Sequence, residues 1–498
     1  MPLITTTTTN PATGESRELD FAESDTAAVR AAVGHAVQAT ADLDALGRLS
    51  RAELLDAIAD ALEARRIDIV AAAESETALG ETRLNGELTR TTYQLRFFGE
   101  VLREGSYLEA TIDHAGDTPM GPRPDLRRML LPIGPVAVYA ASNFPLAFSV
   151  AGGDTAAALA AGCGVVVKAH PAHPATSDLV GRIVGSVAGN AVSVIHGRDA
   201  GIMLVSEPAI RAAGFTGSPG GGRALADLAA ARPEPIPFYG ELGSLNPVLV
   251  SPEAARTRAA EIGTGLSASI VLGGGQFCTK PGIVLVPDNA DGEQIVRVLA
   301  HDASLTPAKP ALTTAMADAY AAGVEALSGE TGAALAVTRH DAADGATAPT
   351  VVAFDGDEFT GALLEECFGP VAVVARYRDD AHAARLLQSL PASLTGSLFL
   401  DEDDRGVPLA RNVVAAKSGR ILYNQYPTGV AVSWAQNHGG SWPSTNSVHT
   451  SVGATSIRRF LRPVAWQNAP QPELPEELRD AYAAVPRRVD GRLVLPRE

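Results

Sequence analysis

The sequence predicts an α/β fold with parallel sheets, and three observations support this prediction. Short runs of nearly continuous apolar residues alternate with amphipathic helical segments over most of the chain, a pattern typical of parallel β-α-β units. Hydrophobic residues make up 46% of the sequence and charged residues 19%, so the chain is not disordered. At about 100–200 residues per domain, the 498 residues predict two or three domains.

The N-terminal region is predicted to be helical. Across residues 24–105, Ala, Leu, Val and Ile recur at spacings of three and four residues. Ser50 is followed by Glu53 three residues later, which is the sequence pattern of an N-terminal helix cap. Residues 107–130 are polar and end in a charged stretch, so we expect an exposed ribbon or linker there.

Two regions of alternating strands and helices follow. The first covers about residues 134–243, and the second resumes after Glu241 and reaches residue 425. The tail from 462 to 498 is rich in proline and charge, and we expect it to cover a surface or a partner subunit. The apolar runs that predict strands are 134–142, 163–171, 191–197, 210–218, 246–251, 282–287, 371–377 and 419–425.

Charge and cysteine content exclude several classes of protein. The net charge of −17 disfavours binding to nucleic acid or to an anionic membrane, because both need a basic face. The three cysteines, Cys163, Cys278 and Cys367, are too few for a disulfide scaffold and fit a reducing compartment. The most apolar stretch, 155–167, is too short to span a bilayer, and the N-terminus does not read as a targeting segment. We therefore expect a soluble, cytoplasmic protein.

A glycine-rich turn follows one of the predicted strands. In "FTGSPGGGRAL", Gly217 and Gly222 stand five residues apart, and a helix is predicted to begin after them. Glycines at such a turn allow a backbone to approach a pyrophosphate, which the helix N-terminus also favours. Steric demands of a tight turn would select the same residues, so the motif alone does not decide between these interpretations.

Three other residues are candidates for chemistry at a carbonyl group. Cys278, in "LGGGQFCTK", has an accessible backbone around its thiol, whereas Cys163 begins an apolar strand and reads as core. Glu241 lies in a glycine-bounded turn, where a carboxylate acts as a base or is simply a cap. Asn143 follows the end of a strand, where its amide can serve an oxyanion or form an Asx turn.

These segments together resemble the aldehyde dehydrogenase superfamily over nearly the whole chain. The motifs, in order, are "SNFPL", "VVVKAHP", "FTGSPGGG", "ELGSLNP", "GGGQFC" and "EECFGP". The resemblance implies a Rossmann-like NAD(P)-binding domain, an α/β catalytic domain, and a small β element that bridges subunits of a homodimer or homotetramer. We assign residues 1–113 and 133–243 to the first domain, 244–458 to the second, and 114–132 with 459–498 to the bridging element and tail.

The resemblance also assigns the catalytic roles. Cys278 matches the nucleophile, whose thiolate attacks the aldehyde carbon to give a thiohemiacetal. Asn143 matches the oxyanion donor, together with the backbone N–H of Cys278. Hydride then leaves for the nicotinamide and a thioester remains, which water activated by Glu241 hydrolyses. Members that pass the thioester to coenzyme A generally lack this glutamate, so its presence favours hydrolysis.

The cofactor residues are assigned in the same way. NAD-preferring members carry a glutamate at the position of Pro171, and its absence here permits a 2′-phosphate, for which Arg198 is a candidate partner beside Lys168. We therefore expect NADP to be preferred, with NAD as the alternative. His170 and His173 have no third ligand nearby in sequence, so no metal site is expected. The residues that match the cofactor site are Lys168, Gly217, Ser218, Gly222, Glu366 and Phe368.

The substrate prediction rests on the C-terminal segment. Residues 424–453, with "KAHPAHP" and the tail, resemble the branch that contains 2-oxoglutarate semialdehyde (2,5-dioxopentanoate) dehydrogenases. The same branch includes NADP-linked long-chain fatty aldehyde dehydrogenases, which are the alternative, and a non-catalytic relative is a remote third interpretation. We expect oxidation of the semialdehyde to 2-oxoglutarate. The candidate substrate residues are Phe144, Phe148, Phe277, Ser441, Trp442 and Ser444.

Overall fold

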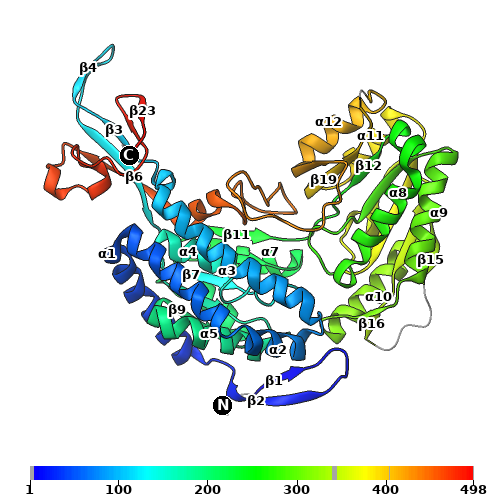
Figure 1. Cartoon of the computed structure of the whole chain (residues 1–498), viewed down its shortest axis with the longest axis horizontal. Helices are drawn as coiled ribbons and strands as arrows, with labels where there is room; N and C mark the ends of the chain where they lie inside the picture. Colours follow the sequence, from blue (N-terminus) through cyan, green and yellow to red (C-terminus); the bar gives the residue numbers. More distant parts are fainter. Residues whose placement is uncertain (1–4, 339–344, 403, 497–498) are drawn as a thin grey trace.

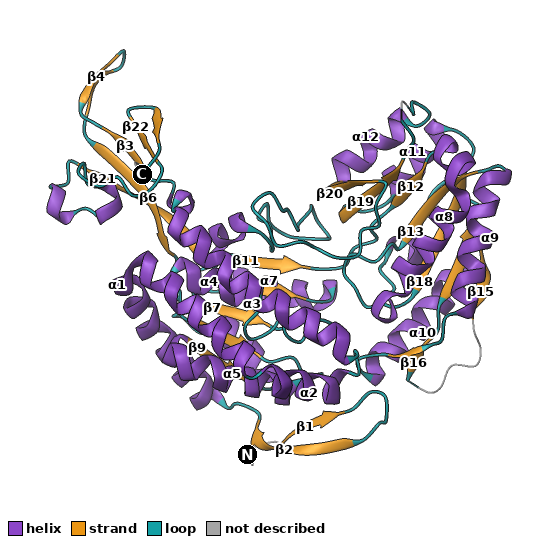
Figure 2. Ribbon diagram, viewed as in Figure 1, coloured by secondary structure: helices purple, strands orange, loops and turns teal. Residues whose placement is uncertain are grey.

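Three β-sheets organise the chain in the computed structural model, which describes residues 5–338, 345–402 and 404–496 (Figures 1 and 2). A parallel five-stranded sheet is covered by the N-terminal helices, and a seven-stranded sheet forms a second α/β layer. Another sheet, also of five strands, projects as an arm from the helical part. The α/β fold class that the sequence predicts is thereby confirmed. The two large sheets lie within the segments assigned to the cofactor and catalytic domains, whereas strand β3 of the arm (Thr111–Asp113) falls in the segment assigned to the cofactor domain. The domain boundaries stay predictions.

The N-terminal segment forms a hairpin and then three helices. The hairpin pairs β1 (Thr5–Thr9) with β2 (Ser16–Ala22), and the helices are α1 (Thr26–Ala64), α2 (Arg66–Thr77) and α3 (Glu81–Glu104). The predicted helical region is confirmed, because the apolar residues spaced by three and four are buried. The predicted cap at Ser50 is wrong: α1 is interrupted three residues earlier, at Gly47, whose φ of 78° an L-residue rarely adopts.

The five-stranded sheet is entirely parallel, in the order β11-β10-β7-β8-β9. The chain therefore runs outward from β7 in both directions, which is the doubly wound order of a Rossmann-like sheet. Ligands of such sheets bind at the carboxyl ends of the strands, beside the point where the order reverses. The elements are β7 (Val136–Tyr139), α4 (Gly153–Ala161), β8 (Val165–Lys168), α5 (Pro174–Ala188), β9 (Val192–Ile195), α6 (Arg198–Ser206), β10 (Ala212–Thr216), α7 (Pro219–Ala231) and β11 (Phe238–Glu241).

The seven-stranded sheet has the order β15-β17-β18-β13-β12-β19-β20, and only the edge strand β15 is antiparallel to its neighbour. Each run predicted here as a strand contains one. A two-stranded ribbon of β14 (Lys309–Pro310) and β16 (Ala346–Thr347) lies apart from it. The elements are β12 (Val248–Val250), α8 (Pro252–Val271), β13 (Ile283–Pro287), α9 (Ala290–Leu305), α10 (Thr314–Gly329), β15 (Ala333–Thr338), β17 (Thr350–Phe354), β18 (Val371–Tyr377), α11 (Asp380–Ser389), β19 (Ser393–Phe399), α12 (Pro408–Lys417) and β20 (Ser418–Tyr423).

The arm joins the segment after α3 to the C-terminal tail. Its sheet has the order β21-β6-β3-β22-β23, and a hairpin of β4 and β5 extends it. Residues 107–130 are thus largely strand. The alternation of apolar and polar residues typical of a strand is not visible in the sequence there, because one inward-facing residue is Arg127, which is buried and paired with Asp125 and Asp480. The strands are β3 (Thr111–Asp113), β4 (Gly116–Thr118), β5 (Gly121–Arg123), β6 (Leu126–Pro132), β21 (Leu461–Gln467), β22 (Arg487–Val489) and β23 (Arg492–Val494).

Among the residues that the structure describes, no helix has both the length and the apolar character that are needed to cross a membrane.

Candidate active site

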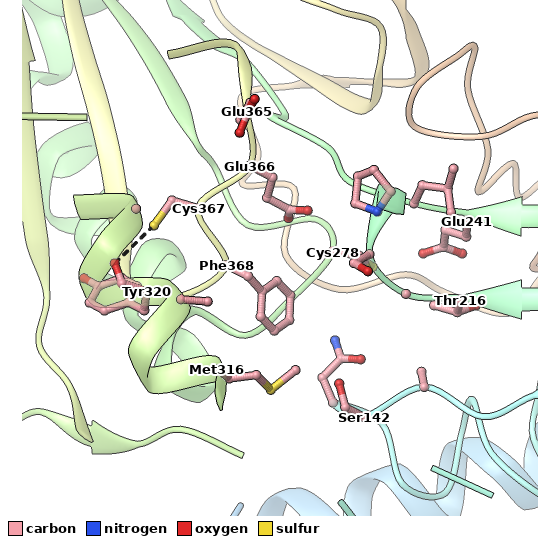
Figure 3. A pocket seen from close by; sticks show the side chains of 18 of the residues that line it. Ser142, Thr216, Glu241, Cys278, Met316, Tyr320, Glu365, Glu366, Cys367 and Phe368 are labelled. Carbon is pink, nitrogen blue, oxygen red and sulfur yellow. Dashed lines mark hydrogen bonds between the residues drawn. The ribbon is translucent and has the colours of Figure 1, made fainter. Parts of the chain in front are cut away.

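A cavity of about 410 Å³ lies at the carboxyl ends of β7, β10 and β11, between the two large sheets (Figure 3). One wall comes from the turns after these strands, and the opposite wall comes from α10 and the segment before β18. Cys278 lies between the two walls. Lining residues that matter for the chemistry are Asn143, Gly217, Ser218, Glu241, Cys278, Glu366 and Phe368, all of which the sequence singled out.

The backbone before Cys278 is held in a conformation that glycine favours. Helix α8 ends at Val271, and Gly273, Gly274 and Gly275 follow with φ values of 59°, 70° and 68°. A Cβ on Gly275 would lie 2.3 Å from the backbone of Gly369 and Pro370, so this position also needs glycine for space. The three glycines therefore bring the thiol to the cavity while packing the loop against the segment that follows Glu366.

Asn246 fixes the turn after the nucleophile. Its Nδ2 donates to the carbonyl oxygens of Cys278 at 2.8 Å and Lys280 at 2.9 Å. Its Oδ1 accepts from the hydroxyl of Ser244 at 2.8 Å. Asn246 is fully buried in the "ELGSLNP" motif, and sequence reasoning assigned it no role.

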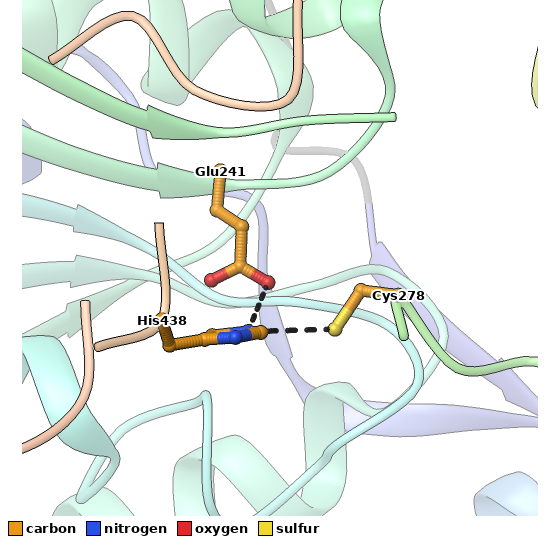
Figure 4. A group of neighbouring side chains, drawn as sticks. All are labelled: Glu241, Cys278 and His438. Carbon is orange, nitrogen blue, oxygen red and sulfur yellow. Dashed lines mark hydrogen bonds and ion pairs between the residues drawn. The ribbon is translucent and has the colours of Figure 1, made fainter. Parts of the chain in front are cut away.

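Cys278 faces a buried pair formed by His438 and Glu241 (Figure 4). The Sγ atom lies 3.7 Å from Nε2 of His438, and this nitrogen lies 2.9 Å from Oε1 of Glu241. Ser451 donates its hydroxyl to the other carboxylate oxygen at 2.8 Å. Sequence reasoning missed His438, which lies in the 424–453 segment; its only signal was a histidine bounded by polar and glycine residues in "QNHGG".

The surroundings fix where the protons are. Burial opposes ionisation of Glu241, yet His438 and Ser451 lower its pKa to about 2, so it is a carboxylate. Burial and the charge of Glu241 raise the pKa of the Cys278 thiol well above its usual value, so the thiol is protonated. Among the described residues nothing bonds to Nδ1 of His438, whereas Nε2 lies 2.9 Å from a carboxylate oxygen that can only accept, so Nε2 carries a hydrogen. That N–H points toward both Glu241 and Cys278.

Cys278, Glu241 and His438 also offer three donor atoms within 4.8 Å of one another. Sulfur, imidazole nitrogen and carboxylate oxygen are ligands that Zn²⁺ accepts. A metal there would occupy the nucleophile. His170 and His173, the pair weighed in the sequence, bond instead within the protein: His170 accepts from the Ala172 amide, and His173 Nε2 lies 2.8 Å from the Ala141 carbonyl oxygen.

Asn143 is held so that one amide hydrogen stays free for a ligand. Its Nδ2 donates to the carbonyl oxygen of Gln276 at 3.0 Å, two residues before the nucleophile. The backbone carbonyl oxygen of Asn143 accepts from Nη2 of Arg83 at 2.6 Å. Because a primary amide carries two N–H bonds, the second can serve an oxyanion formed on the substrate.

The wall opposite Asn143 carries Glu366 and Phe368. Glu366 is partly buried, and loss of solvation raises its pKa to about 7 although the charge of Lys280 opposes this. One oxygen accepts from the backbone N–H of Ser244 at 3.3 Å. Lys280, itself buried, donates from Nζ to the carbonyl oxygen of Val371 at 2.6 Å. The other carboxylate oxygen of Glu366 is the one available for a ribose hydroxyl.

In the glycine-rich turn, some residues line the cavity and others are small for steric reasons, so both interpretations of the sequence apply. Gly217 and Ser218 line the cavity, and Ser218 caps α7 by accepting from the Gly221 amide. Gly222 is absent from the lining: it is buried, and a Cβ there would lie 2.2 Å from Leu242. Close packing of α7 on the segment after β11 therefore accounts for Gly222.

A second cavity of about 830 Å³ lies along the same end of the sheet, beside the N-terminal hairpin. Its lining includes Lys168, His196 and Arg198. It also includes Pro171, at the position where NAD-preferring members of the family carry a glutamate. Glu23, from the end of the hairpin region, lines it too and was not predicted. Two cations, a helix N-terminus and the carboxylate Glu366 in the neighbouring cavity suit a nicotinamide dinucleotide.

The six candidate substrate residues fall into two groups. Phe144 packs against Phe148 and Phe277, with ring centroids 5.4 and 5.2 Å apart, so these three form one aromatic cluster beside Asn143 and Cys278.

The other three lie elsewhere. The Trp442 ring stacks on Arg223 of α7, and Ser444 is buried with its hydroxyl on the Ser441 carbonyl oxygen. Ser441 lines a separate cavity whose lining does not include Cys278.

The fold and this arrangement of side chains define an aldehyde-oxidising oxidoreductase that uses a nicotinamide cofactor. Residues 4–464 match the aldehyde dehydrogenase family, and the chain belongs to it.

Relatives of known activity are similar over most of their length. The chain is 47% identical over 464 residues to alpha-ketoglutaric semialdehyde dehydrogenase 2 of Azospirillum brasilense, covering 89% of this chain and 87% of that protein. It is 41% identical over 466 residues to alpha-ketoglutaric semialdehyde dehydrogenase of Acinetobacter baylyi, with the same coverage of 89% and 87%.

Solved structures share the fold at low identity. Aldehyde dehydrogenase 21 of Physcomitrella patens, solved with its product succinate, has a TM-score of 0.80 at 20% identity, covering 94% of this chain and 96% of that one. Aldehyde dehydrogenase C of Pseudomonas syringae, solved as a mutant with NAD⁺ and octanal, has a TM-score of 0.79 at 22% identity, covering 94% of each chain.

Proposed function

We propose that the protein oxidises 2-oxoglutarate semialdehyde (2,5-dioxopentanoate) to 2-oxoglutarate, with NADP as the preferred cofactor. The observation that carries the proposal is the convergence of Cys278, Asn143 and Glu241 at one end of a cavity that suits a nicotinamide. The two relatives at 47% and 41% identity, both named for this semialdehyde, support the choice of substrate.

The reaction begins when Cys278 loses its proton to a water molecule in the site and its sulfur bonds to the aldehyde carbon. The oxygen of the resulting thiohemiacetal accepts from the free N–H of Asn143 and from the backbone N–H of Cys278. A bound nicotinamide supplies the two-electron oxidation, which leaves a thioester on Cys278. Glu241 then takes a proton from water, the hydroxide adds to the thioester carbon, and the carbon–sulfur bond breaks to release the acid.

His438 supports either anion in this sequence. Its Nε2–H lies near the carboxylate of Glu241 and the sulfur of Cys278, so it stabilises whichever of the two is charged. It acts through these groups and is a positioning residue. An N–H held between the carboxylate and the thiolate lowers the energy of both charged groups.

Preference for NADP is supported by Lys168 and Arg198 in the second cavity and by the lack of a glutamate at Pro171. Glu23 acts against it, because a carboxylate repels a 2′-phosphate. We expect Arg198→Ala to raise KM for NADP about tenfold and KM for NAD less than twofold, since a charged hydrogen bond contributes about 1.5–3 kcal/mol. Initial rates with each cofactor measure this, and an equal effect on both would refute a role for Arg198 at the phosphate.

Assembly and location form part of the same proposal. A homodimer or homotetramer joined through the arm is supported by the pairing of β21 with β6, which makes the tail part of a built sheet. A reducing, cytoplasmic location is supported by Cys163, Cys278 and Cys367, all three of which are free thiols.

The deciding experiment compares substrates. Initial rates are measured for 2,5-dioxopentanoate and dodecanal, each with NAD and NADP. A kcat/KM advantage for the dioxo acid supports the proposal. An advantage for dodecanal would keep the catalytic residues in their roles and replace the substrate by a long-chain fatty aldehyde.

A further inference from the structure

Arg90, on helix α3, has a buried guanidinium group without a partner. Among the described residues nothing accepts a hydrogen bond from Nη1 or Nη2, although both atoms are shielded from solvent. A guanidinium group stays charged at physiological pH, and burying it without compensation is unfavourable. The two terminal nitrogens together form the edge that binds a planar carboxylate through two parallel hydrogen bonds.

The surroundings of Arg90 place this edge against the aromatic cluster that adjoins Cys278. The guanidinium carbon lies 5.1 Å from the centroid of the Phe148 ring, one of the three rings of the aromatic cluster. Burial lowers the pKa of Arg90, and the charges of Glu87, Cys278 and Glu241 raise it, so these three groups lie within reach of its field. In return, the charge of Arg90 lowers the pKa of the Cys278 thiol.

Glu87, one turn before Arg90, does not take up the guanidinium. Its Oε1 accepts from the backbone N–H groups of Leu146 at 2.8 Å and Ala147 at 2.9 Å. These bonds hold the loop that carries Asn143 and Phe144. Oε1 of Glu87 is therefore used to shape the site, and in the described structure its Oε2 is buried without a hydrogen-bond partner. The charge of Glu87 partly compensates that of Arg90, but the N–H groups of Arg90 are left facing the aromatic cluster.

Arg83 adds a second cation two turns earlier on the same helix. Its guanidinium carbon lies 4.8 Å from the Phe277 ring centroid and 5.2 Å from that of Phe144. Its Nη2 is used by the Asn143 carbonyl oxygen, and in the described structure its Nη1 is buried without an acceptor. The aromatic cluster beside Cys278 is thus flanked by positive charge, which a purely apolar aldehyde would leave unsatisfied.

We propose that Arg90 binds the carboxylate of the substrate and selects aldehydes that carry an anionic group at the far end of a short chain. The carboxylate oxygens accept from Nη1 and Nη2 while the carbon stem lies along Phe148 and its neighbouring rings. This proposal rests on the proposed function, because it takes the aldehyde end of the same molecule to lie at Cys278. It assigns to a helix residue the recognition expected from Ser441 and Ser444.

The test compares Arg90→Met with a matched control on the same helix, Arg103→Met. Arg103 is 44% exposed and pairs with Asp56, so its removal leaves the site alone. Initial rates are measured with 2,5-dioxopentanoate and with pentanal, which has the same chain length and no charge. We expect Arg90→Met to lower the ratio of kcat/KM for the acid over that for pentanal about 100-fold, mainly through KM, whereas Arg103→Met keeps the wild-type ratio.

Two further measurements make the outcomes distinct. An equal loss with both aldehydes, together with slower alkylation of Cys278, would overturn the proposal, because Arg90 would then act on the thiol. If Arg90→Met does not fold, Arg90→Lys keeps a buried charge without the fork, and it should raise KM for the acid about tenfold; an unchanged KM overturns the proposal.

Other anionic aldehydes separate this inference from the proposed function. If the wild-type enzyme prefers succinic or glutaric semialdehyde to 2,5-dioxopentanoate, the proposed substrate is wrong. Arg90→Met must then still remove the advantage of that semialdehyde over the neutral aldehyde of equal length. If the wild-type enzyme prefers 2,5-dioxopentanoate and Arg90→Met keeps that preference over pentanal, only the role of Arg90 is wrong.

Discussion

The two sides of Cys278 are built in different ways. Toward the cavity, Asn143, Gly217 and Glu366 come from short turns that each follow or precede a strand of a large sheet. On the other side, His438 comes from a long irregular segment and Arg90 from the middle of a helix. The first side is shaped by sheet geometry, which suits a cofactor, and the second is free to vary with the substrate.

Removing the nucleophile tests the element that both sides share. Cys278→Ala should lower kcat by about 10⁴-fold or more, because Cys278 forms the covalent intermediate. Steady-state rates with a preferred aldehyde measure it. The control is Cys163→Ala, which removes a buried thiol in the core of the cofactor sheet and should keep kcat. Comparable losses in the two variants would remove Cys278 from its role.

Glu241→Gln separates the two halves of the reaction. Acylation should still release reduced cofactor, while deacylation should slow by about 10²–10⁴-fold, because the amide cannot take a proton from water. Stopped-flow absorbance should therefore show a burst of about one equivalent per active site and then a stall. A linear time course without a burst would mean that Glu241 acts before the thioester forms.

Asn143→Ala tests the cavity side alone. Losing one oxyanion donor should lower kcat by about 10²–10³-fold. Asn143→Asp keeps the length of the side chain but replaces the amide donor by a carboxylate, so it should lower kcat at least as much. Thermal unfolding provides the control, because the bond from Nδ2 to the Gln276 carbonyl oxygen also ties two loops together. If kcat falls no further than stability explains, the amide has only a structural role.

The cavity side could be predicted from the sequence and the other side could not, for a physical reason. Glycines at positive φ before a cysteine, or a proline after a strand, form a pattern that is local in the sequence. The pattern is local because a single backbone turn sets the position of the functional side chain. His438 is positioned by contacts with Glu241, which lies almost 200 residues away in the sequence. Arg90 lies in a helical sequence whose pattern does not distinguish it from a solvent-exposed arginine. Burial without a partner becomes visible only when α3 is packed.

The fold shows the same division. The parallel strands were predicted because buried strands are continuously apolar. The arm was predicted only as an exposed ribbon or linker, and as a β element through the resemblance, because its strands are exposed on one face and carry a buried arginine. Ser50 failed as a cap because a glycine that takes positive φ breaks the helix more strongly than a favourable capping sequence.

The last comparison sets His438 against Glu241, which act on the same thiol with opposite sign. Burial and the charge of Glu241 raise the pKa of Cys278, so Glu241→Gln should speed alkylation by iodoacetamide at pH 8. His438→Phe removes an N–H that can stabilise the thiolate, so alkylation should slow about tenfold, with His438→Gln restoring part of the rate. A change in the same direction for both variants would contradict the arrangement.

His438→Phe should also change the response of stability to acid. The pKa of Glu241 is lowered from 4.5 to about 2 on folding, so its contribution to stability is present above pH 4.5 and is lost as the pH falls from there toward about 2. In His438→Phe the folded pKa rises toward 4.5, so this contribution shrinks and unfolding becomes less dependent on pH in that window. Denaturant midpoints between pH 3 and pH 6 measure the slope. An unchanged slope would mean that Ser451 and Cys278, rather than His438, keep Glu241 ionised.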